Sequence, residues 1–113
     1  MEREIDLGTL ARGEQGELRV FMFEDGRKKL NLPQCQVEIN VVMPGTATPI
    51  LAFSSARDEV EIIQNVAIAT LTPVQTEELQ PGRYVVEVIV EDPVLGDRQR
   101  AMKGTLQIEE SSA

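Results

Sequence analysis

Carboxylate side chains are the catalytic raw material that this sequence holds in quantity, with 19 Asp and Glu among 113 residues. The closely spaced pairs are Glu59 with Glu61, Glu77 with Glu78, Glu87 with Glu91, and Asp92 with Asp97. Two carboxylates hydrolyse a glycosidic bond only when they face each other across a cleft at a defined separation and one of them has a raised pKa. Adjacent or alternating acids on exposed strand faces do not show this arrangement. We therefore interpret the pairs as solvated surface charges.

Other kinds of catalytic or ligand-binding site lack the residues they need. The chain has no His and one Cys, so no Ser-His-Asp triad, Cys-His pair or His-based metal site can be written. The segment from Asp92 to Asp97 lacks the dense oxygen spacing of a calcium loop. No Gly-x-Gly or Gly-Lys-Ser/Thr run is present to cradle a phosphate. We expect no catalytic, cofactor-binding or metal-binding residues, and hence no enzyme.

Charge and cysteine content restrict the partners and the compartment. The formal net charge of −8 repels phosphate backbones, so nucleic acid is not an expected partner. The lone Cys35 forms no intramolecular disulfide, which suits a reducing cytosol. The charged start, residues 1–6, does not resemble a signal peptide, and Glu87 interrupts the longest apolar run, so no membrane span is expected. The acidic surface serves either solubility or docking to a basic partner, and charge sign does not decide between them.

Alternation of apolar and polar residues with a period of two dominates the chain and predicts strands. The expected strands are 17–24, 35–41, 50–53, 60–62, 66–70, 83–91 and 98–108, with an irregularity near 103–104. The strands 60–62 and 66–70 form one predicted hairpin, and the last two form another. Cys35 begins one alternating strand and is predicted to be a small buried core residue.

One short helix is predicted near residues 72–79, where Thr72 serves as N-cap, Pro73 takes the first helical position and Gln75 completes a capping box. Tyr84 opens the most β-branched strand, and we expect its ring in the core and its hydroxyl on a backbone carbonyl. The elements indicate an all-β, immunoglobulin-like antiparallel β-sandwich of about seven or eight strands. Residues 13–109 form this single domain, 1–12 are an N-terminal arm or a first strand, and 110–113 are a polar tail.

Candidate assembly contacts come from two segments. In the strand 17–24, Leu18, Val20 and Met22 alternate with Phe21 and Phe23, so one apolar set can lie outside a single core and form an assembly surface. In the segment 1–12, the apolar residues are Ile5, Leu7 and Leu10. This segment either adds a strand to another subunit or forms the first strand of its own sandwich.

Several short motifs in the second half of the chain resemble those of a small protein found in tailed bacteriophages. The most specific is the run from Thr76 through Leu79 and Gly82 to Tyr84, a "Leu-x-x-Gly-x-Tyr" entry into the penultimate strand. The second is the close from Gly104 to Ile108. Asp25-Gly26, Leu30-Asn31-Leu32, the strand from Val37 to Val41, Gly96 and Arg100 also match in order. The chain is similar to the immunoglobulin-like domain at the N-terminus of phage baseplate upper proteins and to stand-alone immunoglobulin-like virion proteins.

This resemblance implies a non-enzymatic virion structural protein that acts through subunit contacts. The implied partners are other virion proteins of the capsid, neck, tail or baseplate, together with further copies of the chain as a homo-oligomer in the particle. The implied location is the virion, after assembly in the bacterial host cytoplasm, and a role in capsid decoration stays open beside one in the tail. The alternative is a stand-alone β-sandwich module that binds carbohydrate or a host surface.

Overall fold

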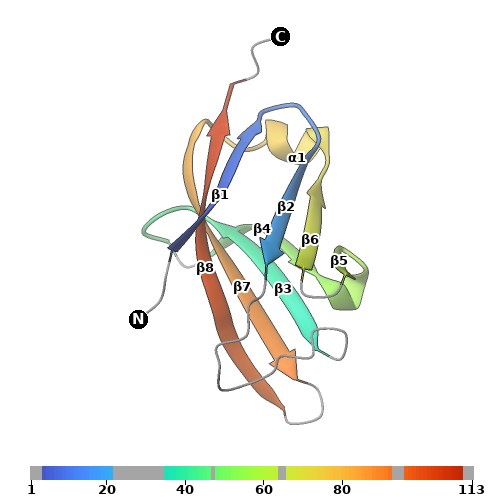
Figure 1. Ribbon diagram of the computed structural model, residues 1–113. Helices are drawn as coiled ribbons and strands as arrows, with labels where there is room; N and C mark the ends of the chain where they lie inside the picture. The colour runs from blue at the N-terminus through green and yellow to red at the C-terminus, as the bar shows by residue number, and fades with distance from the viewer. Residues whose placement is uncertain (1–3, 22–34, 47, 64–65, 93–95, 111–113) are drawn as a thin grey trace.

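The structure, a computed structural model, describes residues 4–21, 35–46, 48–63, 66–92 and 96–110. These residues form eight strands, one 3₁₀ helix and one α-helix, arranged in two layers (Figure 1). The elements are β1 (Glu4–Ala11), β2 (Gly16–Phe21), β3 (Gln36–Val42), β4 (Pro49–Ser54), η2 (Ser55–Arg57), β5 (Val60–Ile63), β6 (Val66–Leu71), α1 (Pro73–Glu77), β7 (Gly82–Asp92) and β8 (Asp97–Glu109).

The two layers are a five-stranded sheet in the order β1-β8-β7-β3-β4 and a three-stranded sheet in the order β2-β6-β5. Neighbouring strands run antiparallel except β1, which pairs in parallel with β8. Strands β2, β6 and β5 take the places of B, E and D in an immunoglobulin fold, and β3, β7 and β8 take those of C, F and G. The predicted all-β, immunoglobulin-like sandwich is confirmed.

The core lies between the sheets and consists of alternate residues from each layer. Strand β3 contributes Val37, Ile39 and Val41, as its alternation predicts, and β2 contributes Leu18 and Val20; all five are fully buried. Strand β7 adds Tyr84 and the valines at 86, 88 and 90. Because each strand buries one of its two faces, the opposite residues form the outer faces of the sandwich.

The residues of β6 that are buried are not the large ones that indicate this strand in the sequence. The sequence indicates this strand by the large residues Val66 and Ile68, but the structure buries Ala67, Ala69 and Leu71. Val66 and Ile68 lie on the opposite, outer face and are partly exposed. Small alanines fit the inner face because the neighbouring strands fill the space between the sheets with larger side chains.

The helix α1 has the predicted capping box. The hydroxyl of Thr72 accepts a hydrogen bond from the Gln75 amide N–H at 3.2 Å, and the Gln75 side chain accepts one from the Thr72 N–H at 2.9 Å. Pro73 starts the helix, which ends at Glu77 and is shorter than the predicted 72–79. The chain turns away there and buries Leu79 in the core.

Hydrogen bonds between the β1–β2 connection and α1 hold the helix against the end of the sandwich. Thr76 is fully buried, and its hydroxyl donates to the backbone carbonyl of Glu14 at 2.8 Å. The guanidinium of Arg12 donates to the Glu77 carbonyl from Nε at 3.1 Å and from Nη2 at 2.8 Å, and it pairs with Glu110 at 2.8 Å. A cation at the C-terminal carbonyls of a helix is favourable because it complements their partial negative charge.

Strand β1 is an edge strand of its own chain. A register shift between Asp6 and Thr9 divides its pairing with β8, and Gly8 adopts a φ of 94°, a conformation that glycine tolerates best. The Asp6 carboxylate accepts a hydrogen bond from the Gly8 N–H at 2.8 Å. Leu7 and Leu10 pack against the core, and a Cβ added to Gly16 would lie 2.7 Å from a methyl carbon of Leu10. Two roles were expected for residues 1–12. In the structure, Glu4–Ala11 form a strand of the five-stranded sheet of the same chain.

Two local expectations differ from the structure. Cys35 is partly exposed rather than buried, because it precedes β3 and packs only at the margin of the core. The irregularity in β8 lies at Ala101, where Val88 pairs with Met102 and Ile89 with Arg100, rather than at 103–104. Asp25 and Gly26, which match the phage motifs, lie outside the described residues.

Tyr84 shows the predicted combination of a buried ring and a bonded hydroxyl. Its side chain is 4% exposed, and its hydroxyl donates to the Gln80 carbonyl at 2.7 Å. A tyrosine at the start of strand F that bonds the backbone a few residues upstream is the tyrosine corner of immunoglobulin-like domains.

We expect Tyr84→Phe to lower the free energy of unfolding by about 1 kcal/mol, since it removes one hydrogen bond and keeps the ring. Urea denaturation measures this change, and an unchanged midpoint would contradict the role of the hydroxyl.

Leu10 tests whether β1 belongs to its own domain. Because Leu10 is partly buried against the core, Leu10→Ala should lower the free energy of unfolding of the isolated chain by about 1 to 2 kcal/mol. An arm that serves another subunit would leave the isolated chain equally stable after the same change. Thermal and urea denaturation of dilute protein distinguish the two results.

Candidate functional site

The acidic pairs lie at different places in the fold. The Glu59 carboxylate is bound by Arg57 at 2.6 Å and by the Ser54 N–H at 3.2 Å, whereas Glu61 is exposed on the next strand. Glu77 and Glu78 are exposed around the end of α1, and Glu87 and Glu91 lie on the outer side of β7. Asp92 and Asp97 lie at the facing ends of β7 and β8. The side chains of Glu59, Glu61, Glu77 and Glu78 are exposed.

Neither a metal cluster nor a membrane-spanning helix is seen in the part of the chain that the structure describes. Within those residues, no three or more Cys, Asp or Glu side chains gather in a way that could hold a metal ion. The helices among them are also too short and too polar to cross a membrane.

The outer face of the three-stranded sheet is the first candidate surface. It consists of the described residues that alternate with the buried ones, namely Glu17, Arg19, Glu61, Ile63, Val66, Ile68 and Thr70. Ile63 is 51% exposed, and it pairs with Val66, which is partly exposed. Ile68, also partly exposed, lies two residues along the same central strand. These three aliphatic residues form an apolar patch on two neighbouring strands, which we call the Ile63 patch.

Charged residues flank the Ile63 patch on both sides. Ile68 of β6 pairs with Arg19 of β2 on one side and with Glu61 of β5 on the other. Arg19, Ile68 and Glu61 thus form a row across the sheet, with a positive residue at one end, an apolar residue in the centre and a negative residue at the other end. Arg19 also contacts Glu17 of its own strand at 3.5 Å, an exposed ion pair. Glu61 forms no salt bridge with the residues that the structure describes.

The residues predicted as assembly contacts lie at different places in the structure, and one of them is outside the described residues. Leu7 and Leu10 pack against the core of their own chain. The backbone of Ile5 pairs with Gly104, and that of Phe21 pairs with Val66 of the Ile63 patch. Phe23 lies outside the described residues. Ile63, Val66 and Ile68 were not expected on the surface from the sequence, and the signal that could have shown them is the equally alternating set at 67, 69 and 71, which is the buried one.

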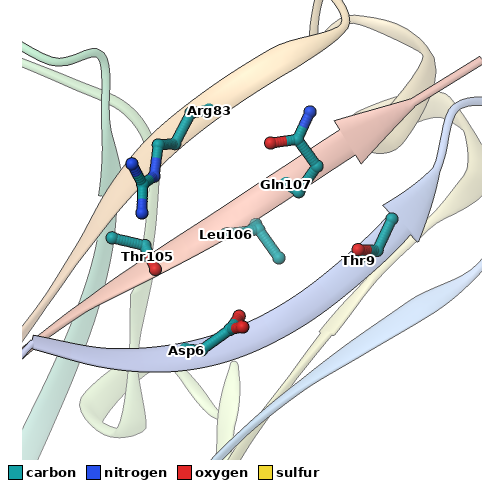
Figure 2. A pocket seen from close by; sticks show the side chains of 6 residues that line it. All are labelled: Asp6, Thr9, Arg83, Thr105, Leu106 and Gln107. Carbon is teal, nitrogen blue, oxygen red and sulfur yellow. The ribbon is translucent and has the colours of Figure 1, made fainter.

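A polar groove on the outer face of the five-stranded sheet is the second candidate (Figure 2). It has a volume of about 370 Å³ and crosses β1, β8 and β7. Its lining residues are Asp6, Thr9, Arg83, Thr105, Leu106 and Gln107. Arg83 and Asp6 lie on opposite sides of β8 (Figure 2).

The groove offers both hydrogen-bond donors and hydrogen-bond acceptors. Arg83 supplies donors, Asp6 supplies acceptors, and the threonine hydroxyls and the Gln107 amide can do both. Its volume is at the small end of the range for ligand sites, and its lining contains no aromatic ring. Tyr84 cannot serve as an exposed stacking platform, because it is buried and its hydroxyl is already bonded.

The outer edge of the five-stranded sheet at β4 is covered by side chains. The Ala52 carbonyl accepts a hydrogen bond from Arg57 at 3.4 Å, and the Ser54 N–H donates to Glu59 at 3.2 Å. The ion pair between Arg57 and Glu59 thus occupies backbone groups that an edge strand would otherwise offer to another chain. Pairing through β4 is disfavoured for this reason.

The geometry supports binding through a sheet face more strongly than binding through the β4 edge. The Ile63 patch combines exposed apolar area with charges on both sides, and the groove combines several polar groups over three hydrogen-bonded strands.

No protein-family model and no curated protein sequence matches this chain.

Proposed function

We propose that the protein is a non-enzymatic structural component of a bacteriophage virion and that it acts through subunit contacts. The observation that carries this proposal is the Ile63 patch on the outer face of the three-stranded sheet. An apolar patch flanked by charged residues is the composition of a protein contact surface, in which the apolar centre is dehydrated and the charges set orientation. The partners are other virion proteins of the capsid, neck, tail or baseplate.

The assignment to a virion is supported by the resemblance of the motifs around α1 and β7. Their residues have structural roles here: Thr76 and Leu79 are buried beside the helix, and Tyr84 forms the tyrosine corner. They hold the domain together and leave the sheet faces free for contacts. A sandwich used in this way works by repetition of copies in a symmetric particle rather than by turnover.

Incorporation into particles tests the proposal. We expect the protein in purified virions of the phage that encodes it, at a constant ratio to the major capsid protein measured by quantitative mass spectrometry. A ratio near one indicates capsid decoration, and a few to a few tens of copies indicate the neck, tail or baseplate. Ile63→Asp should lower the copy number at least several-fold, because a buried unpaired carboxylate is costly at a contact.

The matched control for this experiment is Val74→Asp. Val74 is an aliphatic residue that is 65% exposed, but it lies on α1 and away from the Ile63 patch. It should leave the copy number unchanged, and urea denaturation should show that both variants remain folded. Absence of the wild-type protein from virions contradicts the proposal, as does an equal loss of both variants.

The polar groove favours a second candidate function, a module that binds carbohydrate on a host surface. Its donors and acceptors match saccharide hydroxyl groups, although the aromatic ring that often stacks on a sugar is missing from the lining. Under this alternative, a panel of bacterial surface saccharides should cause saturable NMR shift changes at the amides of Arg83, Thr105 and Gln107. Arg83→Ala should abolish them while Arg19→Ala, on the other sheet, should not. A panel without saturable changes in the wild-type protein would count against this candidate.

A further inference from the structure

The row across the three-stranded sheet is self-complementary. Arg19 lies on one side of Ile68 and Glu61 on the other, each on a strand that pairs directly with β6. Neighbouring strands in a sheet are about 4.8 Å apart, so the two charged residues lie at nearly equal distances from the central strand. A two-fold axis that runs parallel to β6, above Ile68, exchanges the positions of Arg19 and Glu61. A second copy on this axis would place each Arg19 over the partner's Glu61.

The centre of the same face can exclude water in such an arrangement. Ile68 lies at the axis and would meet its own copy, while Val66 and the 51% exposed Ile63 extend the apolar area along the strands. Two sheets that pack face to face keep their mean strand directions within about 30° of each other, and an axis parallel to β6 meets this condition. Arg19 would then lie between Glu17 of its own chain, at 3.5 Å, and the partner's carboxylate.

The charge of the whole chain restricts where two copies can make contact. At a net charge of −8, two copies repel each other over most of their surface. They can approach closely where opposite charges meet and apolar area is buried at the same time. The α1 end does not meet this condition, because Glu14, Glu77 and Glu78 are all exposed there. The β4 edge does not meet it either, since its own ion pair covers it.

We infer that the outer face of the three-stranded sheet binds a second copy of this chain in an isologous, face-to-face dimer, with Arg19 of each copy paired to Glu61 of the other. This inference rests on the proposed function, in which the same face is an assembly surface, and it names the partner. The interface is symmetric, so each contact occurs twice and a single substitution changes both.

A charge-exchange experiment tests the inference on the full-length purified chain. Sedimentation equilibrium should show a dimer for the wild type, and its dissociation constant should rise about tenfold or more for Arg19→Glu and for Glu61→Arg, because each variant opposes like charges twice. The double variant Arg19→Glu/Glu61→Arg should restore dimerisation, since opposite charges face each other again. The matched control is Arg83→Glu, which makes the same charge change on the other sheet and should leave the dimer intact.

The outcomes separate this inference from the proposed function. A wild-type chain that stays monomeric up to about 1 mM overturns the dimer, as does a double variant no better than the single ones. If such a monomer is nevertheless found in virions, the proposed function stands and another protein binds the face. If the dimer forms and follows the charge exchange but virions lack the protein, the dimer stands and the virion role fails.

Discussion

The burial of β7 between its two neighbours and beneath the three-stranded sheet is the interaction on which the rest of the structure depends. This strand pairs with β3 on one side and β8 on the other, and its inner residues Tyr84, Val86, Val88 and Val90 are almost fully buried. Burial of each such side chain stabilises the fold by about 1.5 to 3 kcal/mol relative to exposure. The tyrosine corner fixes where β7 begins, because the Tyr84 hydroxyl is bonded to Gln80 and Leu79 is buried just before it.

In this arrangement every second residue of a strand lies on an outer face of the sandwich. The two outer faces differ in chemical character. The five-stranded sheet presents a polar groove with Arg83 and Asp6 on opposite sides of β8, whereas the three-stranded sheet presents the Ile63 patch between Arg19 and Glu61. The edges differ as well, since the side chains of Arg57 and Glu59 cover β4 and a register shift interrupts β1. Both edges of the five-stranded sheet are therefore poorly suited to pairing with a strand of another chain.

Several features were predictable from the sequence because neighbouring residues determine them. The capping box needs only Thr72, Pro73 and Gln75 in order, and the structure has it at those positions. The strand from Gln36 to Val42 follows from strict alternation, and the hairpin of β7 and β8 follows from two long β-rich segments around a turn. The inner face of β6 was not indicated in this way, because Val66 and Ile68 are larger than the alanines at 67 and 69 and suggest the wrong side. Side-chain size shows that a strand exists, but the space between the sheets decides which face is buried.

The sequence by itself therefore determined an all-β chain with a short capped helix, a buried tyrosine and a strongly acidic surface, because each depends on local spacing or on composition. Only the tertiary structure decided the pairing of β1 with β8, the cover over the β4 edge and the row that joins Arg19, Ile68 and Glu61. Arg19 lies more than forty positions before Glu61 and Ile68, which belong to one hairpin, and hydrogen-bond register makes the three residues neighbours. Register is set by which faces are buried against the other sheet, a condition that no local segment contains.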